Sequence, residues 1–416
     1  MSLHVPPALR HRSFRLLWIG FIISVAGSQM QLWALFWHIR TLTDKPIALG
    51  GIGLARIAPI IIFSLVGGAL ADSINRRKLL FVTQSVMALT ALGLAILTFS
   101  GQIVLWHIYA LTAIQAVAIS FDAPARQSMV PNLVPAKDLA NAFSMTSIAR
   151  QTGAIIGPAL NGLVIAYLGQ YYTYLFNAVS YLAVIVALVL MGSVSQQAAP
   201  GKRVTVSLVD IRAGITFILN HPIILSTMLL DFFATFFSSA NTLMPIFARD
   251  VLKVGAVEYG WLSAAQSIGA MAAALVISQI SELRRQGAVF LGSVVAFGLS
   301  TIAFGTSRTV AMAMAGLILI GASDSVSTII RNTIRQLQTP DYIRGRMTSV
   351  NQIFFMGGPQ LGEIEAGIVA QISSAPFAVI TGGIGCLVAV ALIARRWPKI
   401  RRYNGDEPVL AGSLAD

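Results

Sequence analysis

The chain is a succession of long apolar stretches separated by short polar segments. A helix that crosses a lipid bilayer needs about 20 mostly apolar residues, so each stretch predicts one membrane-spanning helix. Twelve such stretches occur, at residues 15–39, 47–71, 79–99, 103–123, 140–167, 171–192, 222–247, 257–281, 287–305, 309–330, 348–371 and 375–396. The pattern therefore predicts an all-α integral membrane protein with twelve transmembrane helices.

The composition agrees with a membrane protein. Of the 416 residues, 56% are hydrophobic and only 11% are charged, whereas a soluble domain carries about 25% charged residues. The mean hydropathy is +0.76. The single cysteine, Cys386, excludes a disulfide within the chain. The first apolar stretch is too long for a secretory signal peptide, so we interpret residues 1–14 as a cytoplasmic leader.

The lysines and arginines are unevenly distributed between the predicted loops. With twelve spans both termini lie on one side, and 22 of the 29 basic residues fall in the leader, the tail and the loops of that side, counting those at the adjoining span ends. Five fall in the opposite loops and two, Arg56 and Arg150, well inside spans. Because basic residues collect on the cytoplasmic side of membrane proteins, both termini are predicted to be cytoplasmic. The net charge of +13 is then expected to face anionic lipid rather than nucleic acid.

The predicted spans form two halves. We expect an N-terminal six-helix half at 1–192, a cytoplasmic linker at 193–221, a C-terminal six-helix half at 222–398 and a disordered tail at 399–416. Within the linker, apolar residues between 208 and 219 recur near helical spacing. This spacing predicts an amphipathic helix on the inner membrane surface.

The segments after the fourth span of each half resemble each other. At an offset of 205 residues, Arg126 matches Arg331 and Pro135 matches Pro340. Two six-span halves of parallel topology are found in secondary transporters. The sequence therefore favours a transporter built from two pseudo-repeats.

The segment GGALADSINRRKLL at 67–80 ends an apolar run with one aspartate and three basic residues. It resembles the loop signature of the major facilitator superfamily, G-x-L-A-D-R-x-G-R-R/K-x-x-L, through Gly68, Leu70, Ala71, Asp72, Arg76, Arg77 and Leu80. Ser73 and Asn75 depart from the signature. Asn75 is expected to keep the turn because asparagine tolerates a left-handed backbone. The segments PARQSMVPNLVPAKDLANAFS and QTPDYIRGRMTSVNQIFF further resemble the exporter group that includes the enterobactin exporter and the macrolide-efflux proteins.

The resemblance implies a latch that closes the inner face of the protein in its outward-open state. Asp72 and Arg76 are four residues apart and can pair on one helical face. Asp122, at the end of span four, is expected to share the basic residues, and Asp72 is expected to lie near the start of span eleven, at 348–352. The residues implied for the latch are Gly68, Asp72, Arg76, Arg77, Asp122 and Arg126. The alternative is that 72–78 carry topology charges only.

Charged residues inside predicted spans are costly in a bilayer and usually mark function or pairing. Five are candidates for proton coupling or substrate binding: Arg150, Asp231, Asp324, Glu363 and Glu365. The alternative for Arg150 is a structural pair with a carboxylate. Glu363 and Glu365 cannot face the same way and are alternatively solvated at a wet helix end. Asp324 lies seven residues before Arg331 and alternatively forms a second inner latch.

Span five contains RQTGAIIGPALNG at 150–162, which resembles the antiporter motif of exporters. Gly153, Gly157, Pro158 and Gly162 match that motif, whereas Asn161 replaces one of its glycines. The glycines are expected to allow close helix packing. In this superfamily spans one, four, seven and ten line the cavity, so the resemblance implies four lining residues: Gln29, Gln115, Phe236 and Asn241.

No sequence feature indicates an enzyme or a bound cofactor. The G-x4-GK[ST] phosphate loop is absent, so ATP is not expected to drive transport, and five scattered histidines do not predict a metal site. The resemblance implies proton-coupled export of a small amphipathic molecule, such as a siderophore or drug, by a monomer in a bacterial inner membrane. An importer or symporter on the same fold, and a non-transporting scramblase or sensor, are the alternatives.

Overall fold

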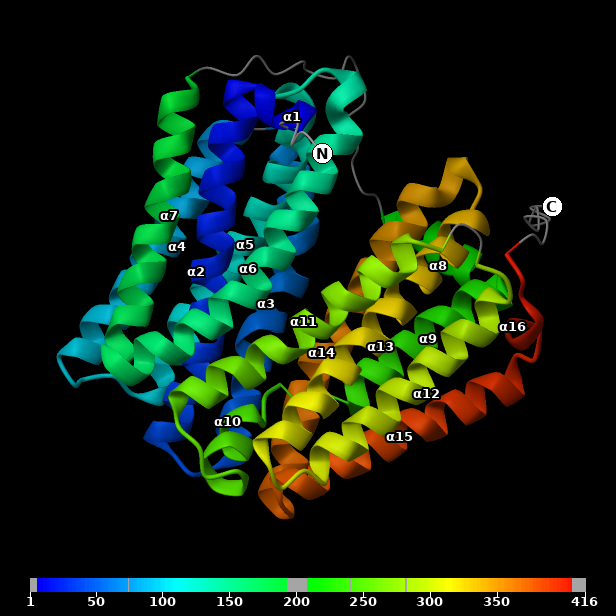
Figure 1. Ribbon diagram of the computed structural model, residues 1–416. Helices are drawn as coiled ribbons and strands as arrows, with labels where there is room; N and C mark the ends of the chain where they lie inside the picture. The colour runs from blue at the N-terminus through cyan, green and yellow to red at the C-terminus, as the bar shows by residue number, and fades with distance from the viewer. Residues whose placement is uncertain (1–5, 74, 193–207, 239–240, 281–282, 406–416) are drawn as a thin grey trace. The chain divides into compact units, whose positions relative to one another are not determined.

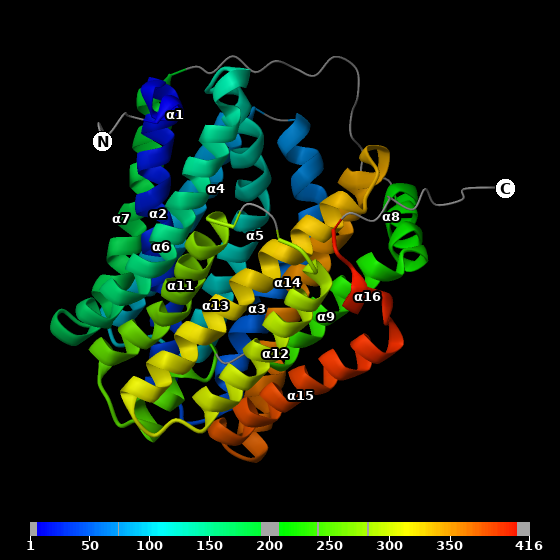
Figure 2. The same cartoon turned by 45° about the vertical axis from the view of Figure 1, so that its right-hand side comes forward.

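The computed structural model describes residues 6–73, 75–192, 208–238, 241–280 and 283–405. Side chains are described in these ranges except at 64–73, 208–213 and several positions between 341 and 356. Within the described ranges every regular element is a helix and none is a strand, as the apolar pattern predicts. Figures 1 and 2 show the helices from two directions.

The helices up to residue 192 are α1 (Pro7–Arg10), α2 (Arg12–Leu42), α3 (Pro46–Ser73), α4 (Arg76–Phe99), α5 (Leu105–Met129), α6 (Leu139–Tyr167) and α7 (Gln170–Met191), with 3-10 turns at Val130–Asn132 and Ala136–Asp138. The helices after residue 207 are α8 (Leu208–Asn220), α9 (Pro222–Phe237), α10 (Met244–Ile246), α11 (Ala256–Ser278), α12 (Gln286–Gly305), α13 (Val310–Leu337), α14 (Asp341–Ile372), α15 (Ala375–Arg396) and α16 (Lys399–Arg402), with a π-helical turn at Phe247–Val251.

The helix starts agree with the predicted spans. Eleven of the twelve predicted stretches have a helix that begins within three residues of their first residue, and α14 begins seven residues before 348. Among the described residues, nine helices are long and apolar enough to cross a membrane, or ten if the bent pair of α8 and α9 is one span. The number twelve therefore stays a prediction.

Side-chain caps explain where several helices begin. Asn75 caps α4 by accepting a hydrogen bond from the Lys78 backbone N–H at 3.2 Å, and Thr309 caps α13 in the same way through Met312. A cap satisfies a donor that the first helical turn leaves free. The expectation that Asn75 holds a left-handed turn is wrong, because its φ is −59°.

The stretch predicted as one span at 222–247 is not a continuous helix. α9 ends at Phe237, and a turn at 241–243 precedes α10. At its other end, α9 bends by 102° relative to the second part of α8. Pro245 lies at the start of α10, where its missing N–H does not interrupt a helix. The polar residues Asn241 and Thr242 mark this break.

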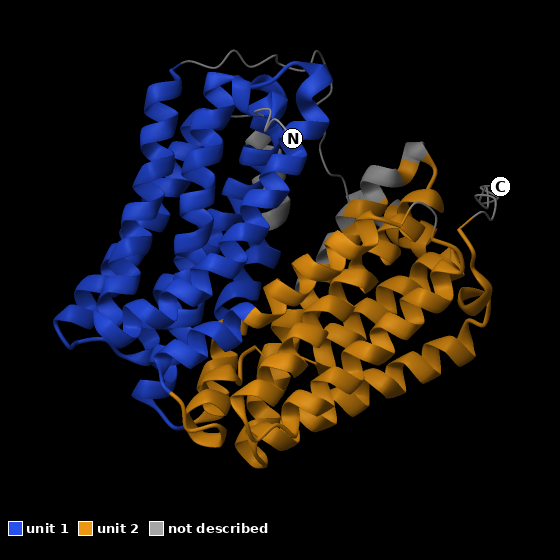
Figure 3. Ribbon diagram, viewed as in Figure 1, with its two compact units in different colours: residues 1–44, 55–205, 255–264 blue, residues 45–54, 206–254, 265–416 orange. Residues whose placement is uncertain are grey.

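The chain forms two compact units, which Figure 3 colours separately. Unit 1 comprises residues 1–44, 55–205 and 255–264, and unit 2 comprises residues 45–54, 206–254 and 265–416. In unit 1, α2 packs against α6 and α7, and α4 packs against α5 and α7. In unit 2, α9 packs against α14 and α15, and α12 packs against α13 and α15. The units differ from the predicted halves at two places. The first turns of α3, at 45–54, belong to unit 2, and the first turns of α11, at 255–264, belong to unit 1.

Glycines allow these two segments to pack closely within their units. In unit 1, a Cβ on Gly162 of α6 would lie 2.5 Å from the Ala256 carbonyl oxygen of α11. In unit 2, a Cβ on Gly367 of α14 would lie 3.2 Å from Gly50 Cα of α3. The two contacts match across the repeat, since Gly162 and Gly367 are 205 residues apart. Small residues let helix backbones approach closely in a membrane.

The predicted amphipathic helix is α8. Phe217 and Ile218 are buried on its inner side in an apolar cluster with residues of α9 and α14. Ile215 and Leu219 are exposed on another side. The part of α8 with described side chains therefore has one face that packs on protein and one that is apolar and exposed.

Candidate functional site

The fourth helix of the second half, α13, carries a row of polar side chains on one face. Asp324, Ser327, Arg331 and Arg335 follow one another at spacings of three or four residues, so they point in similar directions. The helix continues to Leu337, seven residues beyond its predicted end. The predicted boundaries place Arg331 and Arg335 in a cytoplasmic loop. In the structure both residues are helical and buried.

Arg331 pairs with a carboxylate from another helix. Its Nη1 lies 2.8 Å from Oδ1 of Asp231 on α9, and both side chains are at most 3% exposed. The same Nη1 lies 3.7 Å from Oδ1 of Asp324. The structure thus brings together two of the predicted charged residues, Asp231 and Asp324, around Arg331.

Arg335 is held by residues of two other helices. It donates to the hydroxyl and the carbonyl of Thr227 on α9, at 3.1 and 3.0 Å. It also donates to Oδ1 of Asn351 on α14 at 2.6 Å. Its Nη2 lies 3.6 Å from Oδ2 of Asp231. Arg335 therefore ties α13 to both α9 and α14.

The carboxylate of Asp231 lies between the two guanidinium groups but accepts no hydrogen bond of good geometry from the described residues. Removing charged groups from water costs several kcal/mol per ion unless good geometry compensates. Because its hydrogen-bond geometry is poor, the Asp231 pair recovers less of this cost than a pair that serves stability alone would be expected to recover. We define Asp231, Asp324, Arg331 and Arg335 as the unit 2 charge cluster.

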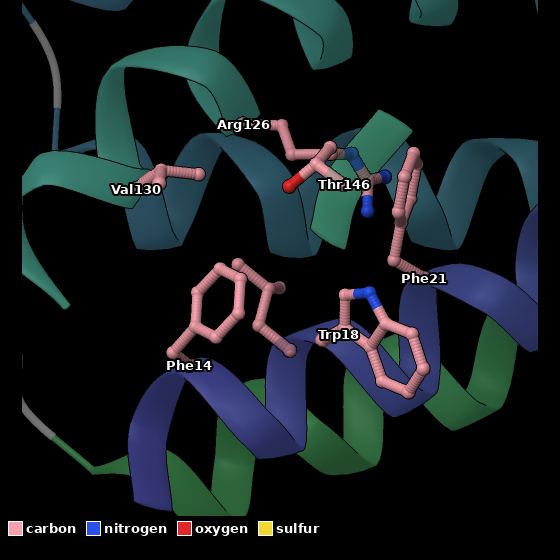
Figure 4. A pocket seen from close by; sticks show the side chains of 7 residues that line it. Phe14, Trp18, Phe21, Arg126, Val130 and Thr146 are labelled. Atoms are coloured by element: carbon pink, nitrogen blue, oxygen red, sulfur yellow. The ribbon is translucent and has the colours of Figure 1, made fainter. Parts of the chain in front are cut away.

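Unit 1 contains a related cluster on α5. Asp122 accepts hydrogen bonds from Arg126 on the same helix, with Arg126 Nη2 at 2.7 Å. It also accepts from Thr83 at 3.1 Å and from Gln84 at 2.7 Å, both on α4. The Arg126 guanidinium lies 4.6 Å from the centre of the Phe21 ring of α2, and Figure 4 shows the two side chains together.

A small pocket opens beside Arg126. It is lined by Phe14, Leu17, Trp18, Phe21, Arg126, Val130 and Thr146 (Figure 4). The space in it that a water-sized molecule can occupy is about 10 Å³, far less than the 300–1,000 Å³ usual for ligand pockets. We therefore do not regard it as the main substrate site.

Two basic residues of the predicted latch donate to backbone carbonyls of unit 1. Arg76 donates to the Ser128 carbonyl at 2.9 Å, and Arg77 donates to the Leu188 carbonyl at 2.8 Å. Asp122 pairs with Arg126 instead of sharing these two. The surroundings of Gly68 and the side chain of Asp72 lie outside what the structure describes, so the latch stays a prediction.

The other predicted charged residues do not join either cluster. Arg150 on α6 is exposed, and no described carboxylate pairs with it. Glu363 on α14 is buried and packs against Gly53 of α3. Glu365 is half-buried on the same helix.

The predicted cavity residues have varied surroundings. Gln115 is buried, accepts from Gln31 at 2.8 Å and donates to Tyr181 at 2.7 Å, which links α2, α5 and α7. Gln29 packs against Gly157. Phe236 stacks on Phe232 of the same helix, and Asn241 lies in the turn after α9.

The glycines and the proline of the antiporter-like motif lie along α6. Gly153 and Gly157 pack against α2, in contact with Val25 and Ala26. The Pro158 carbonyl oxygen lies against Gly260 of α11, which also contacts Gly162. The spacing of the motif thus places three close helix contacts on one helix.

Three polar residues of the unit 2 site are not predicted from the sequence. The apolar pattern places Arg335 in a loop, and it does not mark Thr227 or Asn351. The signal for Arg335 was its four-residue spacing from Arg331. The contacts of Thr227 and Asn351 depend on how α9 and α14 pack, and one sequence carries no signal for that.

Comparison with known proteins gives consistent matches over nearly the full length. Residues 4–407 match the family model described as transmembrane secretion effector. A protein named enterobactin exporter EntS from Shigella boydii serotype 18 (strain CDC 3083-94 / BS512) is 25% identical over 97% of this chain and 96% of its own length. A protein of the same name from Escherichia coli (strain SMS-3-5 / SECEC) is 24% identical with the same coverage.

Solved transporters share the fold. A bacterial homolog of the human lysosomal transporter Spinster, in an inward-facing and occupied conformation, has a TM-score of 0.72 at 14% identity and covers 94% of this chain and 98% of its own. A POT family transporter in complex with 5-aminolevulinic acid has a TM-score of 0.73 at 14% identity, with coverages of 96% and 98%. The relatives are transporters rather than enzymes. The chain belongs to the transmembrane secretion effector family and is a multi-pass secondary transporter of the major facilitator type.

Proposed function

We propose that this transporter exports a small amphipathic molecule, a siderophore or a drug, in exchange for protons. The substrate class is supported by the relatives named enterobactin exporters. Proton coupling is supported by one observation: a buried carboxylate, Asp231, lies between two buried arginines in the second half. An ionisable group at membrane depth is costly and commonly marks a proton or substrate pathway.

The proposed mechanism is alternating access around a site near the middle of the membrane. Protonation of Asp231 removes its negative charge and so weakens its attraction to Arg331 and Arg335. Because that attraction joins α9 to α13, gain and loss of one proton would change the packing of the second half. The proton gradient is the proposed driving force, and no cofactor is proposed. We further propose that both termini are cytoplasmic and that the protein works as a monomer surrounded by membrane lipid.

The test uses inside-out membrane vesicles in which respiration acidifies the lumen, followed with a fluorescent weak base. Enterobactin, a macrolide and a lipophilic dye are added in turn. Export with proton exchange should make the lumen less acidic when the correct compound is added. Vesicles with Asp231→Asn should show no such response, whereas Asp44→Asn, at a side chain that is 91% exposed, should behave as wild type.

Each other outcome rejects a part of the proposal. If a compound accumulates equally after an uncoupler collapses the gradient, proton coupling is wrong. If protons and compound enter the lumen together, the protein is a symporter. If no compound moves while lipid redistributes between leaflets, the scramblase alternative replaces export.

A further inference from the structure

Two carboxylates compete for one guanidinium group in the unit 2 charge cluster. Arg331 Nη1 is 2.8 Å from Asp231 and 3.7 Å from Asp324. The Asp231 side chain is 2% exposed, whereas the Asp324 side chain is 46% exposed. The guanidinium therefore lies between one carboxylate that is buried and one that is open to its surroundings.

Arg331 is less firmly held than Arg335. It donates a long hydrogen bond, of 3.3 Å, to the Ser327 hydroxyl, and its buried Nε has no hydrogen-bond partner among the described residues. Arg335 instead makes three hydrogen bonds to Thr227 and Asn351, all within 3.1 Å. Of the two arginines, Arg331 is thus the one that can change partner at low cost.

Charge balance gives the direction of that change. The charged groups that act on Asp231 from the described residues are Arg331, Arg335 and Asp324. Two described side chains of α14 that contact the cluster, Asn351 and Phe355, are neutral. With both aspartates ionised, two positive charges face two negative charges. When Asp231 takes up a proton, Asp324 becomes the one remaining anion within 4 Å of Arg331 among the described side chains.

We propose that Arg331 is the coupling residue of this transporter, moving from Asp231 to Asp324 when Asp231 is protonated and returning when the proton leaves. This proposal rests on the proposed proton exchange. The proton binds one Asp231 oxygen, the Asp231–Arg331 ion pair breaks, and the Arg331–Asp324 ion pair shortens. Since Asp231 is on α9 and Asp324 is on α13, each exchange loosens one link between α9 and α13.

The other half of the molecule supplies a design for the test. At the offset of 205 residues, Arg126 matches Arg331 and Asp122 matches Ser327, and the first residues of α5 and α13, Leu105 and Val310, match as well. In unit 1 the acid is therefore on the same helix as the arginine. Ser327→Asp should rebuild that arrangement in unit 2 and give Arg331 a fixed partner one turn away.

The experiment compares Asp231→Asn, Asp324→Asn and the double variant Asp231→Asn with Ser327→Asp. Three quantities are measured in proteoliposomes: folded protein, substrate exchange without a pH gradient, and accumulation driven by the gradient. Asp231→Asn should lower gradient-driven accumulation by about tenfold or more, within the usual range of coupling free energies. The double variant should recover wild-type amounts of folded protein but not accumulation.

If the double variant recovers gradient-driven accumulation, Asp231 is only a counterion for Arg331, and the partner exchange is wrong. If Asp324→Asn accumulates substrate as wild type does at every pH, Arg331 needs no second partner, and the exchange is also wrong.

A readout without substrate separates this proposal from the proposed function. The infrared carbonyl band of a protonated carboxylic acid, measured on purified protein across pH, should lose one component in Asp231→Asn. In Asp324→Asn that component should appear at lower pH, because a negative neighbour and the alternative partner for Arg331 are both removed. If this shift occurs but no substrate moves protons, the exchange stands and the proposed function fails. If substrate moves protons but the band is unchanged in Asp324→Asn, the proposed function stands and the partner exchange of Arg331 is wrong.

Discussion

Arg126 in unit 1 and Arg331 in unit 2 occupy matching positions on α5 and α13 but have unlike carboxylate partners. Arg126 pairs with Asp122 on its own helix, whereas Arg331 pairs with Asp231 on a different helix. A pair within one helix keeps its geometry when neighbouring helices move. A pair between two helices can report or drive their movement, so the two clusters are suited to different tasks.

Hydrogen bonding strengthens the contrast. Asp122 accepts from Thr83 and Gln84 in addition to Arg126, so both of its oxygens have hydrogen-bond donors. Asp231 accepts no well-formed hydrogen bond from the described residues and has a second carboxylate, Asp324, near its arginine. The unit 1 cluster therefore holds α4 to α5 through several hydrogen bonds, while the unit 2 cluster is the one for which we propose a change of partner.

The largest loss of stability is expected from Arg335→Ala. This change removes the hydrogen bonds to Thr227 and Asn351 and leaves the buried Asp231 with one cation. Breaking a buried ion pair from one side costs about 3–5 kcal/mol of unfolding free energy. Thermal unfolding in detergent should show a markedly lower Tm and less folded protein.

The matched control is Arg308→Ala, which removes an exposed arginine before α13 and should leave the Tm unchanged. If Arg335→Ala is as stable as this control, Arg335 is not the anchor that joins α9, α13 and α14. The contrast with the looser Arg331 would then disappear.

A smaller loss of stability is expected from Asp122→Asn. Asparagine keeps an oxygen for Thr83 and Gln84 but removes the charge that faces Arg126, and a hydrogen bond to a charged group is worth about 1.5–3 kcal/mol. The Tm should fall, while the pH dependence of transport by the remaining folded protein should follow wild type. This is the opposite of the result expected for Asp231→Asn.

The contradicting result would be a normal Tm together with lost gradient-driven accumulation. In that case Asp122 would also gain and lose protons during transport, and the distinction between a fixed and an adjustable cluster would be wrong. Asp44→Asn is again the control for the loss of one carboxylate.

The sequence predicts the helices well where the apolar runs are long and end at caps. α4, α12 and α15 begin within three residues of the predicted positions because polar residues such as Asn75 and Ser374 precede their apolar runs. The break after Phe237 was missed, since no proline or glycine marks it. The polar residues Ser238, Ser239, Asn241 and Thr242 are the available signal.

The site was predicted in part. Asp231 and Asp324 stand out because a carboxylate in an apolar run is costly, and Arg331 stands out through its repeat partner Arg126. That Asp231 pairs with Arg331 depends on the packing of α9 beside α13, about 100 residues away in the chain. Charge patterns along one sequence do not specify which of several buried charges meet.

The smallest effect is expected from the aromatic rings beside the two arginines. The Phe21 ring centre is 4.6 Å from the Arg126 guanidinium, and the Phe355 ring centre is 5.8 Å from that of Arg331. Cation–π contacts contribute about 0.5–2 kcal/mol within about 6 Å of the ring centre. Phe21→Leu, which keeps an apolar side chain, should therefore lower the Tm more than Phe355→Leu does.

A double-mutant cycle with Arg126→Gln isolates the contact from the packing of the ring itself. The coupling energy between Phe21 and Arg126 should exceed that between Phe355 and Arg331, measured with Arg331→Gln. A fixed arginine keeps one position over its ring. An arginine that alternates between two carboxylates is near its ring for only part of the time, so its average cation–π energy is smaller. Equal coupling energies in the two units would mean that Arg331 is as immobile as Arg126, which contradicts the partner exchange proposed for it.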